Sequence, residues 1–599
     1  MSRRPAWLPW GSLVFLVVAA LLVTALIVAR PSWFGGDPPA DRRLDTTLLD
    51  IGETDGVRLS DDNGNSSTFT LPVPVDSPVD DPVLRLRGHT EVAGSSTVFL
   101  RVQADGQNVH VSELPSGNHQ LNEDIDLTRS MVEDGEVRVQ VRTTGTLDQQ
   151  RCNLTTDLGA LVVLDAEETR LTGELEDRLH TVRDVVAGLD QKVTLVLAPR
   201  ANDKEWYQTT AQLGAFLTEQ GHDVHFADKV PDEDDGSAIM LGPDDILQDQ
   251  DWDPLTEEGS VRVGERGDQT VLGIVSPNDD VVPTFLTTTP VTTADSDSSD
   301  PTKLQVDRPS GDRATLERLG VDTSVQQIID RRSWRVPYSL ADLPGGTVAK
   351  TLALQMLVPE TTEDARWLVQ VRLNDELVGS KVLTEAGRQN VYTALPPDKQ
   401  LVRNDLVVTL IRDRDLGGCH VRQTSYDVQV LPDSALVVGE PGAGFTAVPA
   451  QFASGFDVLV DPSALEDSPK SLAGLVPTLT EFSGWRQGVS FVWEGEPGTR
   501  PFLQYGEPQG VSAPVQVGDG RISAEGFDLS SFSDGLVVQC VTAGSTPGLV
   551  VTPVGDPGTV VPPYGRERAR LVTAGGGGFT VTADGQVILV PEARAENEE

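Results

Sequence analysis

Apolar and polar residues alternate through two segments of about a hundred residues each, and this alternation predicts antiparallel β-sheet. Within VRVQV (137–141) and LVVTL (406–410), every second position is apolar, which is the period of a strand with one buried face. Turn-forming residues interrupt the pattern about every ten residues, as in β-sandwiches and jelly rolls. We therefore expect two sandwiches, at 65–168 and 331–433.

The two segments also align with each other. Val102 aligns with Val371. The same offset pairs Asp105-Gly106 with Asn374-Asp375 as a turn between two strands, and Val137, Val139 and Val141 with Leu406, Val408 and Leu410. After a two-residue deletion, the following positions pair at the shortened offset: Cys152 with Cys419, and Leu161, Val163 and Leu164 with Val428, Val430 and Leu431. The recurrence predicts an internal duplication. The matched cysteines are interpreted as equivalent core positions, and whether any two of Cys152, Cys419 and Cys540 form a disulfide stays open.

A different pattern follows each predicted sandwich. Residues 192–199 form a continuous apolar run, and residues 205–219 carry a helical apolar face that ends before Gly221. Strand, helix and strand in this order predict a small parallel α/β unit. We expect two such units, at 169–291 and at 434–599, the second ending in additional strands. The segments that carry this prediction are strands 223–227, 237–242, 270–276, 456–461 and 489–494, a helix within 463–482, and a hairpin at 579–590 that turns at Asp584-Gly585.

The N-terminus contains nineteen consecutive uncharged residues, 11–29. With a helical rise of about 1.5 Å per residue, a helix of this length covers the hydrocarbon layer of a bilayer. We expect a transmembrane anchor at 11–30 after a short tail at 1–10; a cleaved signal peptide is the alternative. Two linkers complete the predicted organisation, at 31–64 and, acidic with a short helix, at 292–330.

Composition narrows the possible partners. Aspartate and glutamate total 91 against 47 lysines and arginines, which gives a net charge of −44. A field of this sign repels phosphate backbones, so we expect no nucleic-acid partner.

Motifs for catalysis or cofactor binding are not found in the sequence. It contains no phosphate-binding loop of the G-x-x-x-x-G-K-[ST] type and no G-x-S-x-G nucleophile elbow. His222 and His225 are three apart on a predicted strand, so they face opposite sides and do not form a metal site. We therefore expect a chain that is not an enzyme, with no catalytic residues, no cofactor and no metal.

The order sandwich, α/β, sandwich, α/β resembles the extracytoplasmic, membrane-anchored B-subunit family of bacterial cellulose synthase. The resemblance lies in FTLPVP, LRLRG and VFLRVQADGQNV of the first half, and in WRVPYSLADL, WLVQVRLNDELV and LVRNDLVVTLIRD of the second. It implies a mixed β and α/β fold, with two jelly-roll-like β-sandwiches alternating with two flavodoxin-like α/β domains and one transmembrane helix. The family's usual anchor is C-terminal, whereas the apolar segment here is N-terminal.

The resemblance further implies that residues 1–10 form a short cytoplasmic tail and that the large domain lies and functions outside the cell membrane. It implies a non-catalytic accessory subunit of a cellulose-type exopolysaccharide synthase, which pairs with the membrane-embedded catalytic subunit and guides or binds the nascent β-glucan. Stacking of sugar rings on aromatic faces makes Trp334, Trp367 and Tyr392 the candidate glycan-binding residues, since the first sandwich has no Trp or Tyr between 69 and 165. The alternatives are a cell-surface carbohydrate-binding adhesin that works without a synthase, and a glycoside hydrolase with accessory sandwich domains.

Overall fold

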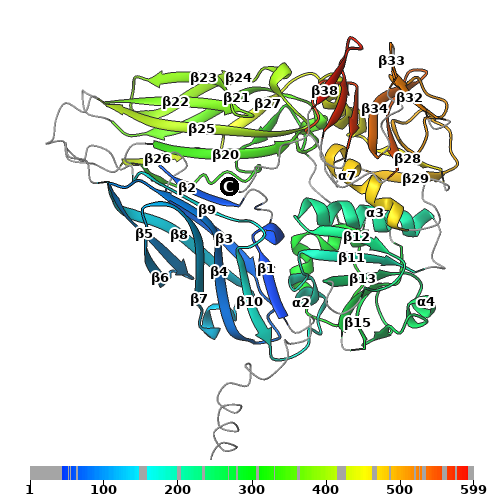
Figure 1. Cartoon of the computed structure of the whole chain (residues 1–599), viewed down its shortest axis with the longest axis horizontal. Coiled ribbons are helices and arrows are strands. Elements are labelled where there is room, and N and C mark those ends of the chain that lie inside the picture. Colours follow the sequence, from blue (N-terminus) through cyan, green and yellow to red (C-terminus); the bar gives the residue numbers. More distant parts are fainter. Residues whose placement is uncertain are drawn as a thin grey trace, which may run out of the picture.

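Figure 1 shows the computed structural model of the chain, which consists mostly of β-sheet. The residues that the structure describes are 43–51, 53, 56–61, 65–147, 158–198, 204–231, 236–267, 269–277, 281–304, 309–328, 331–360, 365–414, 426–461, 469–483, 488–518, 521–524, 526–528, 534–555, 563–573 and 577–590. None of the helices among them is long and apolar enough to cross a membrane. The predicted anchor at 11–29 lies outside the described residues, as do Cys152 and Cys419.

The first sandwich consists of a six-stranded and a four-stranded antiparallel sheet. Alternate residues of both sheets point inward, and their apolar side chains are buried between the layers. The larger sheet has the order β1 (Arg43–Thr47), β10 (Arg170–Leu175), β4 (Val79–Val92), β9 (Ala160–Leu164), β2 (Val57–Ser60), with β7 (Gly117–Asp126) also on β4. The smaller sheet has the order β3 (Ser66–Pro72), β8 (Glu136–Leu147), β5 (Ser96–Ala104), β6 (Gln107–Leu114).

The second sandwich repeats this strand order element by element. Its larger sheet has the order β18 (Arg313–Thr315), β27 (Ala435–Val438), β21 (Ala349–Val358), β26 (Tyr426–Val430), β19 (Gln326–Ile328), with β24 (Gly387–Ala394) also on β21. Its smaller sheet has the order β20 (Arg331–Ser339), β25 (Arg403–Arg414), β22 (Ala365–Leu373), β23 (Glu376–Leu383). Both predicted inter-strand turns use left-handed backbone, at Asp105-Gly106 and at Asn374-Asp375.

The hydrogen-bond register places the two-residue deletion earlier in the chain than the sequence alignment predicted. Ala104 and Leu373 are equivalent, with the same offset as Val102 and Val371. Their partners Val139 and Leu406 already pair at the shortened offset, so the deletion falls before β25. Shifting the alignment by two residues leaves the alternation of apolar and polar positions unchanged, so the sequence pattern does not reveal the shift.

The predicted alignment of β9 with its counterpart β26 was wrong by one residue. The buried positions are Val162 and Leu164 in β9, and Val428 and Val430 in β26. Leu161 is only half-buried, so it is not the equivalent of Val428. Consecutive apolar residues in both strands conceal which of them face inward.

The predicted boundaries of the sandwiches were too narrow. β1 and β2 fall in the predicted linker 31–64, and β18 and β19 fall in the predicted linker 292–330. β10 and β27, which were assigned to the α/β units, also belong to the sandwiches. These strands are short, with three to six residues, so they contain too few positions for alternation to be recognised.

The first α/β unit is a mixed sheet with a parallel centre. Its order is β12 (Asp223–Ala227), β11 (Lys192–Leu197), β13 (Ser237–Leu241), β16 (Gln269–Ile274), β15 (Val261–Arg266), β14 (Asp253–Pro254), with β17 (Ser298–Ser299) on β15. The first four strands are parallel and β15 is antiparallel. Its helices are α2 (Val182–Ala187), α3 (Lys204–Glu219), α4 (Asp244–Gln248) and α5 (Val281–Leu286).

The second α/β unit has the same centre and additional strands. Its sheet has the order β29 (Val489–Trp493), β28 (Phe456–Val460), β30 (Phe502–Tyr505), β35 (Thr546–Val554), β34 (Gly535–Ala543), β36 (Ala569–Val572), β37 (Gly578–Val581), β38 (Val587–Val590). A separate small sheet contains β31 (Val515–Gly518), β32 (Arg521–Ala524) and β33 (Phe527–Asp528), and the helices are α6 (Val448–Phe452) and α7 (Leu472–Phe482). The predicted hairpin at 579–590 is β37–β38, with Gly585 in left-handed backbone.

Helices α3 and α7 join the two α/β units, as Figure 1 shows. Gln208 of α3 donates its amide to the carbonyl of Val489 at 3.1 Å and accepts the backbone N–H of Phe491 at 3.0 Å. Tyr207 meets Trp493 edge to face at 5.4 Å between ring centroids. One cluster of buried apolar side chains therefore runs through the first sandwich and both α/β units, while the second sandwich has a core of its own.

An ion pair between a half-exposed arginine and a buried carboxylate attaches the second sandwich to α7. The Arg403 guanidinium donates to the Glu481 carboxylate at 2.8 Å and to the carbonyl of Thr480 at 2.9 Å. Glu481 is 6% exposed. Burial raises the pKa of its carboxyl, and Arg403 acts against this rise.

We predict that Arg403→Met destabilises the chain by about 3 kcal/mol, because it leaves a buried carboxylate without its cation. The double variant Arg403→Met, Glu481→Met should lose clearly less, since no isolated charge remains. Urea unfolding of the three proteins at neutral pH measures the difference, and equal losses for the single and the double variant would contradict it.

Candidate functional site

The three aromatic residues predicted to bind glycan lie in two different environments. Trp334 is 6% exposed and Trp367 is 2% exposed, both within the core of the second sandwich. Trp367 donates its indole N–H to the carbonyl of Pro359 at 3.1 Å and packs edge to face on Tyr426. The predicted stacking role was wrong for these two tryptophans, because strand alternation places them on the inward face.

Tyr392 lies on the opposite, outward face of the larger sheet. It is 68% exposed. Along β24, Arg388, Asn390 and Tyr392 point outward, while Val391 and Thr393 between and beside them are buried. A phenol ring on an open strand presents a flat face to solvent, which is the arrangement that Trp334 and Trp367 lack.

Amide side chains surround this tyrosine. On the neighbouring strand β21, Gln355 stands opposite Asn390, and Leu357 stands opposite Arg388; Gln429 of β26 then stands beside Leu357. We call this surface, formed by Arg388, Asn390, Tyr392, Gln355, Leu357 and Gln429, the amide face. Arg388 is its one charged member, and two further charged side chains border it: Lys381 donates to the backbone carbonyl of Asn390 at 2.9 Å, and Asp433 pairs with Arg388.

Hydrogen bonds hold parts of the amide face in place. Arg388 donates to the side-chain oxygen of Gln355 and, at 3.1 Å, to the carboxylate of Asp433. Gln429 donates its amide to the carbonyl of Thr323 at 2.8 Å. In the described structure the amide group of Asn390 makes no hydrogen bond, so it can exchange hydrogen bonds with a ligand hydroxyl.

The first sandwich carries a different chemistry at the equivalent place. Ile125 pairs with Leu84 as Thr393 pairs with Leu352, so the residue before it, Asp124, corresponds to Tyr392. Asp124 forms an ion pair with Arg87. The repeat has therefore kept the sheet and changed what its outer face can bind.

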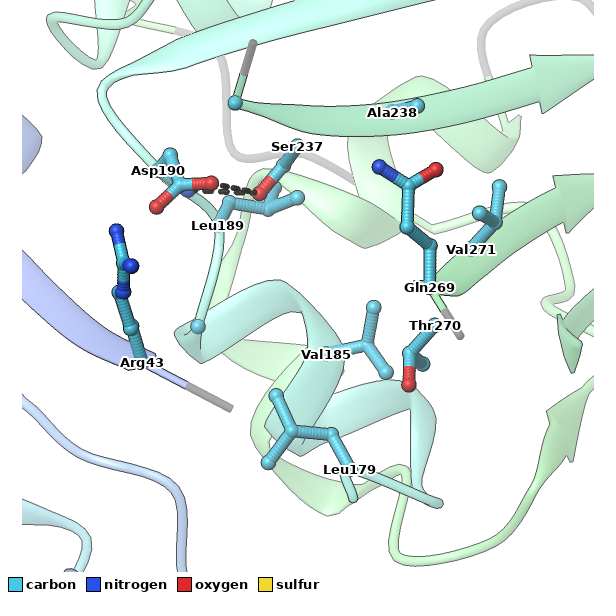
Figure 2. A pocket seen from close by; sticks show the side chains of 12 residues that line it. Arg43, Leu179, Val185, Leu189, Asp190, Ser237, Ala238, Gln269, Thr270 and Val271 are labelled. Carbon is cyan, nitrogen blue, oxygen red and sulfur yellow. Dashed lines mark hydrogen bonds between the residues drawn. The ribbon is translucent and has the colours of Figure 1, made fainter. Parts of the chain in front are cut away.

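A small polar pocket lies where the first sandwich meets its α/β unit (Figure 2). Asp190 and Ser237 face each other across it: the Ser237 hydroxyl donates to the Asp190 carboxylate at 2.9 Å and accepts the backbone N–H of Asp190 at 2.9 Å. Arg43 and Gln269 lie on either side. The pocket has a volume of about 40 Å³, which is room for water but not for a sugar.

Burial shifts the ionisation of Asp190, which lines this pocket. It raises the pKa of Asp190 to about 6; the hydrogen bond from Ser237 acts in the opposite direction, Asp45 and Asp50 add to the rise, and Arg43 reduces it. His222 contacts Asp190 from outside the pocket lining: its Nδ1 is 3.1 Å from the backbone carbonyl of Asp190 and 3.5 Å from the Asp50 carboxylate. The pocket is at the amino ends of β11 and β13, whereas ligands of parallel α/β sheets bind at the carboxyl ends, so we interpret it as structural.

Metal-binding geometry is not found in the described ranges. No group of three or more His, Cys, Asp or Glu side chains there is placed to hold an ion. His225 contacts Asp223 at 2.9 Å on the surface, away from the interactions of His222.

Comparison with known proteins gives only weak similarities. No protein-family model matches the chain, and no curated protein matches it. Among solved structures, the T13 viral particle of IBDV has a TM-score of 0.13 at 13% identity over 22% of this chain and 36% of that chain. A family two carbohydrate esterase from Clostridium thermocellum in complex with cellohexaose has a TM-score of 0.11 at 10% identity, over 28% and 40%.

A third structure matches over a longer part of the chain. The tandem CBM22-1-CBM22-2 domains of Xyn10C from Paenibacillus barcinonensis have a TM-score of 0.13 at 8% identity, over 68% of this chain and all of theirs. The chain spans less than half the length of the first two structures. TM-scores of this size do not establish a common fold.

We predict that Asp190→Asn stabilises the chain at neutral pH. A carboxyl with a pKa of about 6 when folded and about 3.8 when unfolded costs up to about 3 kcal/mol above pH 6, and nothing below pH 3.8. The gain should therefore be full at pH 7.5 and shrink as the pH falls toward 4. Thermal melting across this range measures it, with the exposed Asp253→Asn as control; a gain independent of pH would refute the assignment.

Proposed function

We propose that this chain is a non-catalytic accessory subunit of a cellulose-type exopolysaccharide synthase. In this proposal it is anchored in the cell membrane through residues 11–29, stands outside it, and guides or binds the nascent β-glucan. The proposal also treats the two sandwiches as jelly-roll-like and the two α/β units as flavodoxin-like, in the alternating order of that family.

The amide face is the observation that carries the proposal. Neutral sugars are recognised by aromatic rings, which contact C–H faces, and by amide groups, which match hydroxyls as both donor and acceptor. Tyr392 supplies the ring, and Asn390, Gln355 and Gln429 supply amides on adjacent strands. Arg388 and Asp433 neutralise each other at its edge, so the face suits an uncharged polymer.

The repeated strand order supports the membership in the synthase complex. Both sandwiches have one topology, and both α/β units share a centre of four parallel strands followed by one antiparallel strand. This repeated succession of sandwich and α/β unit is the order expected of that family.

The glycan proposal predicts that Tyr392→Ala weakens binding of a soluble cello-oligosaccharide about five- to tenfold, which corresponds to about 1 kcal/mol of lost ring contact. Tyr392→Phe keeps the ring and should bind nearly as well as the original protein. Leu377→Ala, at an exposed position on β23 of the other sheet, is the matched control. Titration calorimetry with cellohexaose measures all four proteins; an affinity that is the same for Tyr392→Ala and for the original protein would reject the amide face as the site.

The synthase proposal predicts that the full-length chain, extracted from intact membranes in mild detergent, co-purifies with a multi-span glycosyltransferase. Identification of the captured proteins by mass spectrometry is the readout. Capture of none, together with intact cello-oligosaccharide binding, would favour the adhesin alternative.

A further inference from the structure

The second α/β unit contains a cavity of about 500 Å³. Its walls come from the short segment η9 (Gly444–Ala447) with α6, from the small sheet β31–β33, and from β34, β35 and the β37–β38 turn. This volume is within the range of small-molecule sites in proteins, and it is more than ten times that of the pocket in Figure 2.

Much of the cavity wall is built from elements that the repeat does not share. Strands β31–β33 and β36–β38 have no counterpart in the sheet of the first α/β unit. They follow or interrupt the common five-strand centre, and β36 extends its sheet by pairing with β34. The second α/β unit thus has strands that the first lacks, and these additional strands border the cavity.

The lining of the cavity is unusual for so acidic a chain. Arg568 is the one charged side chain among the residues that line it, and no aspartate or glutamate does, although the chain has 91 of them. The nearby Glu567 uses one carboxylate oxygen to accept the backbone N–H of Gly565 at 3.0 Å, and the Arg570 guanidinium lies 3.7 Å from the same oxygen. In the part of the chain that the structure describes, Arg568 itself makes no ion pair.

Further hydrogen-bonding groups in the lining are also without partners among the described residues. They are the amide of Gln451 and the hydroxyls of Ser512 and Thr542. Alanine, valine and proline side chains form much of the remaining wall, and no aromatic ring is present. Arg568, Ser512 and Thr542 are exposed to solvent, and Gln451 is half-buried. A guanidinium without an ion pair, in one lining with an amide and two hydroxyls, is suited to a small molecule that carries one anionic oxygen group and several hydroxyls.

We propose that this cavity binds a sugar-sized organic anion, with Arg568 pairing its carboxylate or phosphate and Gln451, Ser512 and Thr542 holding its hydroxyl groups. The net charge of −44 does not prevent this, because charges more than about 8 Å away are largely screened at physiological ionic strength. This site is independent of the amide face, which lies on the second sandwich.

Titration calorimetry with three probes tests the charge requirement. The probes are glucuronate, glucose 6-phosphate and glucose, which share a ring and differ in the anionic group. We expect at least one of the two anions to bind at least tenfold more tightly than glucose, and the stronger one identifies carboxylate or phosphate as the group recognised. Equal affinity for all three probes, or no binding of either anion at millimolar concentration, would overturn the proposal.

Two variants test the place of binding. Arg568→Gln should weaken binding of the preferred anion about tenfold or more, while Arg521→Gln, on β32 and paired with Asp528 at 3.6 Å, should leave it unchanged. Ala524→Leu narrows the cavity without altering charge and should also weaken binding. Loss of affinity in Arg521→Gln but not in Arg568→Gln would refute the assignment.

Alkylation of Cys540 provides a second measurement, separate from calorimetry. Cys540 is among the residues that line the cavity. Its side chain is half-buried, and desolvation raises the pKa of its thiol, so iodoacetamide should alkylate it slowly. Bound anion should slow the reaction further, as measured by mass spectrometry of the Cys540 peptide, while glucose should not. Equal protection by glucose would contradict recognition of the anionic group.

Discussion

Burial of α3 between two sheets holds most of this protein together. The helix covers β11 and β12 of its own unit and packs on α7 and β29 of the other, and Gln208 hydrogen-bonds the backbone of that second unit in both directions. Segments far apart in sequence thereby share one core. A helix that is buried on nearly every side cannot be exposed to water without a large loss of hydrophobic stabilisation, so burial of α3 stabilises the contact between the two α/β units.

The two halves share one architecture, and their candidate binding surfaces lie where the copies differ. The two sandwiches share one strand order, yet the outer face has an ion pair at Asp124 in the first copy and the open ring of Tyr392 in the second. Likewise, strands without a counterpart in the first α/β unit border the cavity beside Arg568. The core positions that define the fold stayed apolar in both copies, while solvent-facing positions were free to change.

Prediction from the sequence succeeded for long strands and failed for short ones. Alternation in β8 and β25 extends over twelve residues each, which is enough to identify a half-buried strand. β18 and β19 have three residues each, and a strand of that length is recognised only through the longer strand with which it pairs. Trp334 and Trp367 were candidates for glycan stacking for a related reason, because an aromatic residue in a strand does not reveal which face is inward.

The sequence by itself determined the succession of β-rich and α/β units, their duplication and the acidity of the chain, because these properties depend on local periodicity and composition. Tertiary structure alone decided which strands complete each sandwich, that Tyr392 faces solvent while both tryptophans face the core, and that Arg568 lies beside a cavity. These outcomes depend on the register between strands and on close packing between residues far apart along the chain, and a one-residue change of register exchanges the two faces of a strand.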